Sequence, residues 1–135
     1  MQQIQMKESR KLIGLKAESF PNGVVPAFDA LEKKVGKGRK VYGMSRGDGK
    51  SNIDYWACVL ENTNERPPMG CEELEVKAGT YVSERLSNWQ GREEILGQTF
   101  QTLYSHPQVD PNGYCVEEYL DNGDVLCMVR IIPKK

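Results

Sequence analysis

The stretch "YCVEEYLDNGDVLCMVRI", Tyr114 to Ile131, has the pattern of a β-hairpin. Its centre, Asn122-Gly123, is the dipeptide favoured in a two-residue type I′ turn. Side chains alternate across a strand, so the adjacent Glu117 and Glu118 must point to opposite faces of the sheet. The hairpin therefore places one carboxylate on each face, and the turn decides which face each one takes.

A two-residue turn sets a definite register for this hairpin. It places Glu118 opposite Cys127 and Glu117 opposite Met128. We expect helices to cover the face that holds Glu118, although a carboxylate is hard to accommodate there. The second face would carry Cys115, Glu117, Tyr119, Leu126, Met128 and Arg130.

One carboxylate among Met, Leu, Tyr and Cys side chains is typical of an apolar small-molecule cleft with a single polar anchor. Two interpretations of Glu117 stay open: it anchors a ligand, or it forms a structural ion pair with Arg130. Trp56 and Met128 are likewise either ligand contacts or core residues. By symmetry with this hairpin, the first half would contribute Met44, Trp56 and Cys58 to the same cleft.

The whole chain reads as two halves of similar order, about 8–62 and 72–135. Phe28 and Leu31 recur after 72 residues as Phe100 and Leu103, each pair at helical spacing. We expect one α+β domain over 1–135, with duplicated β-α-β-β units, pseudo-twofold symmetry and two helices on antiparallel sheet. The expected strands are 11–18, 40–46, 53–60, 73–87 with a kink at Gly79, 114–120 and 125–132, and the expected helices are 25–35 and 92–104.

Composition excludes several classes of function. A net charge of −1 over 135 residues gives no basic excess for direct nucleic-acid binding. No apolar run reaches the roughly 20 residues that span a membrane, so we expect a cytoplasmic protein with reduced thiols. The four cysteines form no C-x-x-C pair and His106 is the single histidine, which argues against a metal site, a cofactor or a catalytic triad.

The segments "KLIGLK", "PAFDAL", "YWACV", "GTYVSERLSNWQG", "FQTLY" and "CVEEYL" together resemble the GyrI-like effector-binding domain, which is also fused to AraC-type and MerR-type regulators. The resemblance implies two β-α-β-β repeats around a central ligand groove that receives cationic or aromatic compounds. It places the family's ligand-sensing glutamate on Glu117. The chain has no room for a DNA-binding helix-turn-helix, so we expect a stand-alone member. Leu126 and Met128 replace acidic or aromatic groups of relatives, which makes the pocket less anionic.

Three functions follow as hypotheses. The first is a binding protein for flat, lipophilic or cationic aromatic molecules, with Glu117 supplying charge. The second is a detoxifying hydrolase that opens cyclopropane-bearing, DNA-alkylating natural products, as the resemblance implies for some stand-alone members. In that case Glu117 acts as general base or acid and a nearby tyrosine, Tyr104, polarises the conjugated carbonyl. The third is a gyrase-interacting protein. In the first hypothesis, the surface on which an aromatic ligand stacks would come from Trp56, Trp89, Tyr104 and Tyr119.

Overall fold

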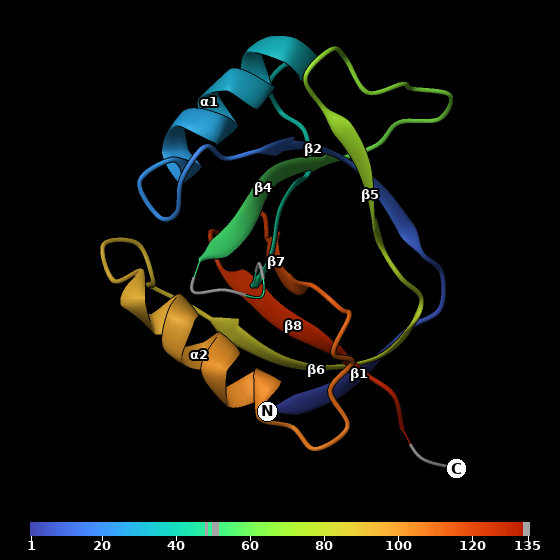
Figure 1. Cartoon of the computed structure of the whole chain (residues 1–135), viewed down its shortest axis with the longest axis vertical. Coiled ribbons are helices and arrows are strands. Elements are labelled where there is room, and N and C mark those ends of the chain that lie inside the picture. Colours follow the sequence, from blue (N-terminus) through green and yellow to red (C-terminus); the bar gives the residue numbers. More distant parts are fainter. Residues whose placement is uncertain (48, 50–51, 134–135) are drawn as a thin grey trace. The chain divides into compact units, whose positions relative to one another are not determined.

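The computed structural model describes residues 1–47, 49 and 52–133, and within these residues it contains two helices and eight strands (Figure 1). The strand pairs within each unit are antiparallel and the fold class is α+β, as predicted. The chain divides into two units. One is the continuous segment Arg10–Val76, and the other combines Met1–Ser9 with Lys77–Lys135.

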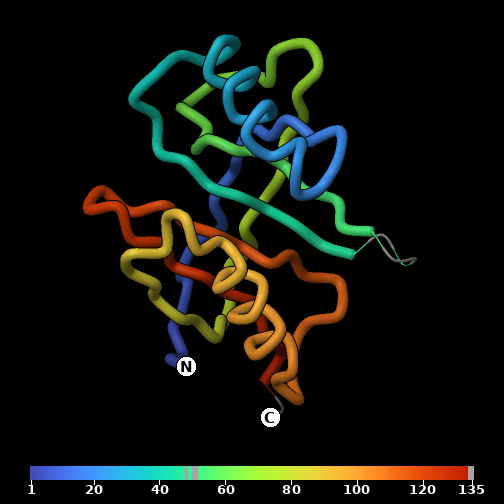
Figure 2. The backbone as a smooth tube through the Cα atoms, turned by 90° about the vertical axis from the view of Figure 1, so that its left-hand side faces the viewer, coloured from blue at the N-terminus to red at the C-terminus, as the bar shows by residue number. Residues whose placement is uncertain are grey.

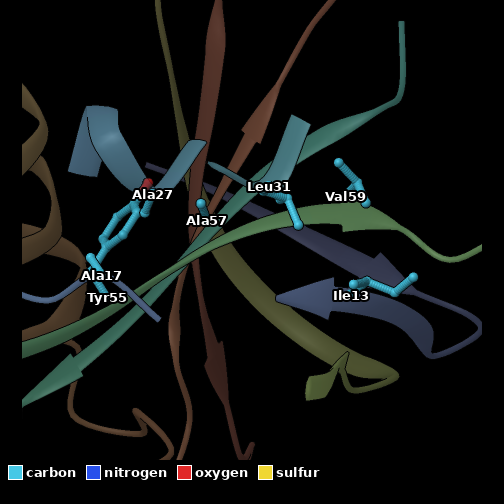
Figure 3. Packing of buried hydrophobic residues seen from close by; sticks show 7 residues of the cluster. All are labelled: Ile13, Ala17, Ala27, Leu31, Tyr55, Ala57 and Val59. Atoms are coloured by element: carbon cyan, nitrogen blue, oxygen red, sulfur yellow. The ribbon is translucent and has the colours of Figure 1, made fainter. Parts of the chain in front are cut away.

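The continuous unit is a four-stranded sheet with one helix. Its strands lie in the order β3-β4-β2-β5, and α1 packs against one face. Alternating apolar residues of β2 and β4 and the Ala27–Leu31 stripe of α1 form the core between them (Figure 3). The elements are β2 Arg10–Lys16, α1 Val24–Val35, β3 Val41–Gly47, β4 Ile53–Leu60 and β5 Glu72–Val76.

The C-terminal end of α1 is tied to the segment that follows β4. Gly36, with φ +95°, ends the helix, and its N–H donates to the carbonyl of Glu32. The Arg39 guanidinium then binds both carboxylate oxygens of Glu65 and donates to the carbonyl of Leu60 at 2.7 Å. This bidentate pair fixes the loop after β4 against the end of the helix.

The second unit repeats this arrangement. Its strands lie in the order β1-β6-β8-β7, and α2 packs against β8 and β6. Leu103 is the buried anchor of α2, with Leu96 and Phe100 beside it. The elements are β1 Gln2–Met6, β6 Gly79–Leu86, α2 Glu94–Tyr104, β7 Cys115–Tyr119 and β8 Val125–Ile131.

Each unit receives its fourth strand from outside its own β-α-β-β repeat. β5 pairs with β2 in the continuous unit, and β1 pairs with β6 in the other. Figure 2 shows the blue N-terminal segment running into the unit built from the yellow-to-red part of the chain. The predicted strand over 73–87 with a kink at Gly79 is therefore two strands: the break lies just before Gly79, and β5, which ends at Val76, and β6, which begins at Gly79, belong to different units. The expectation of one domain over the whole chain stays a prediction.

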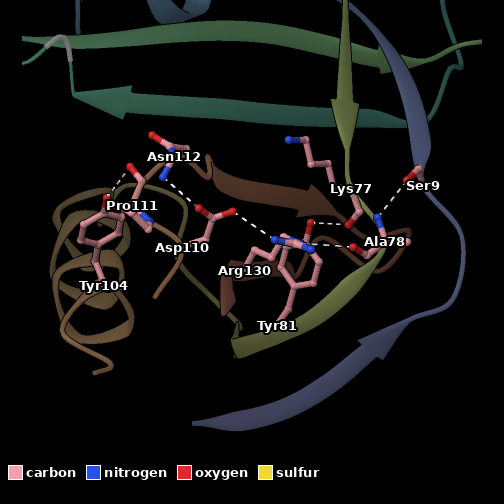
Figure 4. A network of polar contacts seen from close by, with 9 residues as sticks. All are labelled: Ser9, Lys77, Ala78, Tyr81, Tyr104, Asp110, Pro111, Asn112 and Arg130. Carbon is pink, nitrogen blue, oxygen red and sulfur yellow. Dashed lines mark hydrogen bonds and ion pairs between the residues drawn. The ribbon is translucent and has the colours of Figure 1, made fainter. Parts of the chain in front are cut away.

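A polar network fixes the segment just before β6 (Figure 4). The Ala78 N–H donates to Ser9 Oγ at 2.9 Å, and the Ala78 carbonyl accepts from Arg130 Nε at 3.2 Å. Arg130 also forms an ion pair with Asp110, with 3.1 Å between Nη1 and Oδ2. The Tyr81 hydroxyl donates to the carbonyl of Lys77 at 2.6 Å. These bonds satisfy backbone groups where the chain enters the unit.

Candidate functional site

The hairpin turn between β7 and β8 is longer than predicted. The Leu120 N–H donates to the Asp124 carbonyl at 2.9 Å, and the Gly123 N–H donates to the Leu120 carbonyl at 3.0 Å. The turn thus holds three residues, with Gly123 in the left-handed region at φ +90°. This is the hairpin in which a type I turn is followed by a left-handed glycine. Arg85 holds Asp124 in this position, with 2.7 Å between Nε and Oδ2.

The extra turn residue shifts the register by one and reverses the faces of β7. Glu117 lies opposite Cys127 and Glu118 lies opposite Leu126. The prediction that pairs Glu117 with Met128 is wrong, because Met128 lies opposite Val116 on the other face. The covered face now carries Cys115, Glu117, Tyr119, Val125, Cys127 and Val129.

Glu117 therefore belongs to the face that α2 covers, and its side chain is only 8% exposed. Glu118 lies on the opposite face and is partly exposed, so the carboxylate beneath the helix is that of Glu117 rather than that of Glu118. The two adjacent acids do point to opposite faces, but each takes the face that the two-residue turn assigns to the other.

The Glu117 carboxylate accepts a short hydrogen bond from the Tyr119 hydroxyl, with 2.6 Å between the oxygens. Such O–H···O⁻ bonds are shorter and stronger than bonds between neutral groups. Two thiols lie on the same face. Burial raises the pKa of Cys115 to about 11 and that of Cys127 to about 12, and the negative charge of Glu117 adds to both shifts. The carboxylate thus lies among neutral thiols and an aromatic ring.

Trp89 forms the next layer around Tyr119. The two ring centroids are 5.7 Å apart, with 51° between the ring planes. The indole Nε1 donates to the carbonyl of Gly123 at 2.9 Å, and Gln90 Nε2 donates to the same carbonyl at 3.0 Å. The loop before α2 and the hairpin turn therefore meet beside Tyr119.

The interpretation of Glu117 as an ion-pair partner of Arg130 is wrong. Arg130 projects from the opposite face of β8, where its register partner on β6 is Tyr81. Its guanidinium binds Asp110 and the carbonyl of Ala78 instead. Glu117 is thus set apart from this structural network.

Tyr104, the predicted catalytic tyrosine, is the last residue of α2. Its side chain is 42% exposed, and its hydroxyl donates to the Pro111 carbonyl at 3.5 Å (Figure 4). The hydroxyl bonded to Glu117 comes from Tyr119. The i, i+2 spacing of these two residues on one strand is the signal that places them together.

In the continuous unit, Met44, Trp56 and Cys58 lie on the sheet face away from α1, whereas Tyr55, Ala57 and Val59 face the helix. The first three do not occupy the face equivalent to that of Glu117, so the placement that symmetry predicts is wrong. They are fully or nearly buried. The Trp56 indole donates to Glu72, and its ring receives Lys16 and Arg46 at 5.7 and 5.8 Å.

Glu117 has no acidic counterpart at the equivalent position of the continuous unit, which is Gly43. Val59 lies opposite Ile13 just as Val129 lies opposite Val82, so these strand pairs correspond between the units. Two residues along, the pair Gly43–Ala57 then corresponds to Glu117–Cys127.

Sequence reasoning missed an aromatic group on the α1 side of the continuous unit. Phe20 stacks on Tyr55 with 5.8 Å between centroids and 27° between planes, and Phe28 meets Tyr55 edge-on at 6.2 Å. Phe20 is 44% exposed. The period-2 alternation of β4 places Tyr55 on this face, but nothing local predicts that Phe20 returns to cover it.

Two observations bear on metals and membranes. Among the residues that the structure describes, no three His, Cys, Asp or Glu side chains are placed to hold a metal ion. Neither helix in the described part of the chain is long and apolar enough to cross a membrane.

No protein-family model and no curated protein sequence matches the chain. Several solved structures share its fold. An integron cassette protein from Vibrio cholerae has a TM-score of 0.69 at 14% identity, covering 97% of this chain and 95% of its own. The protein SAV2435, solved bound to tetraphenylphosphonium, has a TM-score of 0.60 at 12% identity, covering 97% and 93%. A hydrolase from Listeria innocua has a TM-score of 0.58 at 8% identity, covering 97% and 90%. These TM-scores establish a shared fold.

Proposed function

We propose that this chain is a GyrI-like small-molecule-binding protein for flat, lipophilic aromatic cations, with Glu117 as the acid that receives the positive charge. The observation that carries the proposal is the Glu117 carboxylate itself. It is 8% exposed, lies on the helix-covered face and is bonded to Tyr119. Two thiols and the Tyr119 ring share that face with it.

The chemistry of this face suits an aromatic cation. A carboxylate in surroundings of low dielectric attracts a positive charge more strongly than one in water. The rings of Tyr119 and Trp89 offer electron-rich faces to a cation and flat surface to an aromatic guest. One structure with this fold was solved with tetraphenylphosphonium, a lipophilic aromatic cation, which supports the same ligand class here.

The test is a titration of the purified chain with two cations, tetraphenylphosphonium by calorimetry and planar ethidium by fluorescence. Triphenylphosphine oxide serves as the uncharged control. We expect Glu117→Gln to weaken the binding of both cations by at least about tenfold, because opposite unit charges about 5 Å apart attract by roughly 3 kcal/mol at an effective dielectric constant of about 20. Binding of the uncharged control should change little.

The chain supplies a matched control variant. Glu118→Gln removes the same charge one residue away, on the opposite face of the same strand. It should leave the affinity for both cations within about twofold of the parent. The proposal fails if neither cation binds, or if the two variants weaken binding equally.

A second candidate function rests on the 2.6 Å bond between Tyr119 and Glu117. A carboxylate beside a phenol supplies a base and an acid for opening a strained ring conjugated to a carbonyl. Glu117 takes a proton from water as the water oxygen bonds to a cyclopropane carbon. The ring C–C bond breaks, its electron pair moves into the conjugated carbonyl, and Tyr119 protonates the resulting enolate oxygen. The proton on Glu117 then passes to the Tyr119 phenolate across their hydrogen bond, which restores both groups. Tyr119 replaces Tyr104 in this role, and a hydrolase from Listeria innocua shares the fold.

Mass spectrometry tests this hydrolase candidate with a cyclopropane-containing indole substrate. The expected product carries one added water, and its formation should be lost in Glu117→Gln and slowed in Tyr119→Phe. A substrate consumed equally fast with Glu117→Gln as with the parent chain would rule out this chemistry.

A further inference from the structure

We infer that Trp89 is a positioning residue: it holds the Tyr119 phenol against the Glu117 carboxylate, and the hairpin-turn carbonyl of Gly123 anchors it in that place. The binding part of this inference rests on the proposed function. The geometric part concerns the bonds among Trp89, Tyr119 and Glu117, and it can be tested without a ligand.

The anchor is a carbonyl that the turn makes available. Gly123 adopts φ +90°, and its carbonyl accepts from both Trp89 Nε1 and Gln90 Nε2. The residues around it are fixed in turn. Asp124 is held by Arg85, and its N–H donates to the Asn122 side chain at 3.0 Å. An acceptor held in this way restrains the indole more than a mobile loop would.

The restraint passes from the indole to the phenol through ring contact. Trp89 packs against Tyr119 at 5.7 Å and 51°, which limits the rotation of the tyrosine ring. Tyr119 also packs against the core beneath α2, so the ring is confined by the core and by the indole. Its hydroxyl then meets Glu117 at 2.6 Å.

These contacts join three separate segments of the chain: the loop before α2, the turn after β7 and the strand β7 itself. The one-residue difference in register matters here, because a two-residue turn would place Tyr119 on the other face. The three-residue turn both brings Tyr119 to the covered face and presents the carbonyl that holds Trp89.

A purely stacking role for Trp89 makes a different prediction from a positioning role. If Trp89 only offers a surface on which a ligand stacks, its loss weakens the binding of charged and uncharged aromatic ligands alike. If it positions the phenol and carboxylate, its loss chiefly reduces the preference for a cation over an uncharged analogue, and this effect requires the Tyr119 hydroxyl.

The ligand-free test is fluorine NMR of the chain labelled with 3-fluorotyrosine. The sequence has six tyrosines, and Tyr119→Phe identifies the resonance of interest. Loss of the indole ring current moves this resonance in any case, so the quantity measured is the further shift that Glu117→Gln causes. We expect this further shift to be smaller in Trp89→Leu and, to a lesser extent, in Trp89→Phe than in the parent chain, because the bond between the phenol and the carboxylate is weakened. Gln90→Ala leaves the indole bond in place and is the matched control. A Glu117→Gln shift that is equal in the parent and in both folded Trp89 variants would overturn the inference.

The binding test measures the ratio of affinities for tetraphenylphosphonium and triphenylphosphine oxide. We expect Trp89→Leu to reduce this ratio by roughly threefold to tenfold, in the range of an aromatic contact. In a Tyr119→Phe background the same substitution should cause no further reduction. Full additivity of the two substitutions would overturn the inference. If no cation binds the parent chain, the proposed function fails, and the NMR result still decides the role of Trp89.

Discussion

The Arg39–Glu65 pair should make the stability of the protein depend on pH below about 4.5. Hydrogen bonds from Arg39 lower the pKa of Glu65 from 4.5 to about 2, and a hydrogen bond from the Asn62 N–H contributes to the shift. A carboxyl group with a lowered pKa in the folded state stabilises the fold when ionised. Its contribution is therefore complete above the unfolded-state pKa and is lost as pH falls from about 4.5 toward 2.

The magnitude follows from the shift and from solvent exposure. At 1.36 kcal/mol per pKa unit, the whole shift corresponds to about 3 kcal/mol. The Arg39 and Glu65 side chains are 12% and 24% exposed, so contact with water and salt weakens the pair. We expect Glu65→Gln to lower the free energy of unfolding by about 1–2 kcal/mol at pH 7, and by almost nothing at pH 2.

Urea unfolding followed by circular dichroism, at pH 7, 5, 4, 3 and 2, measures this difference between the parent and Glu65→Gln. The matched control is Glu32→Gln, which removes an exposed carboxylate of α1 in the same unit. Its effect should stay within about 0.5 kcal/mol across the series. A Glu65→Gln effect that is constant with pH, or that grows toward pH 2, would refute the linkage.

Three further outcomes are expected. Leu103→Ala should lower the free energy of unfolding by about 2–5 kcal/mol in urea titrations, because this buried side chain anchors α2 and a cavity would replace it. Cys115 and Cys127, with pKa values of about 11 and 12, should react with iodoacetamide at pH 8 far more slowly in the folded chain than in urea; equal rates would contradict the burial. Gly79→Ala should lower the thermal midpoint, because φ is +140° and a Cβ would lie 2.9 Å from Arg130 Nε; an unchanged midpoint would contradict this reasoning.

Much of the fold could be predicted because its determinants are local. Helical spacing locates α1 and α2, and alternation locates β2, β4 and β8. β1 could not be predicted in this way. Its sequence, "QQIQM", carries only two apolar residues, Ile4 and Met6, and the strand forms because it pairs with β6, far along the chain.

The register of the β7–β8 hairpin could not be predicted from the hairpin sequence alone. "LDNGDV" is compatible with a two-residue turn on Asn122-Gly123 and with a three-residue turn that ends in a left-handed Gly123. The observed choice depends partly on Arg85, a residue of β6 that binds Asp124. A register decided by a distant strand is not readable within the hairpin, although it determines which glutamate the helix covers.

In the candidate site, too, the features set by adjacent sequence could be predicted, and those that join distant segments could not. The resemblance selects Glu117, and strand alternation joins Tyr119 to it; both depend only on adjacent sequence. The contact between Trp89 and Tyr119 and the bond from Trp89 to Gly123 join distant segments, and composition gives no sign of them. Whether Glu117 receives a ligand stays a prediction.

The pairing of β1 with β6 has a consequence for synthesis on the ribosome. β1 is made first, but its partner is made only after the whole continuous unit, and the Ser83 hydroxyl donates to the Gln2 carbonyl across 81 residues. All of Arg10–Val76 lies between the two strands, so their pairing closes a long loop whose entropic cost grows slowly with its length. Closure also brings the amino group of Met1 to within 3.3 Å of the Glu84 carboxylate. A change in β1 would therefore act on the closure of this loop, far along the chain from the residues that are changed.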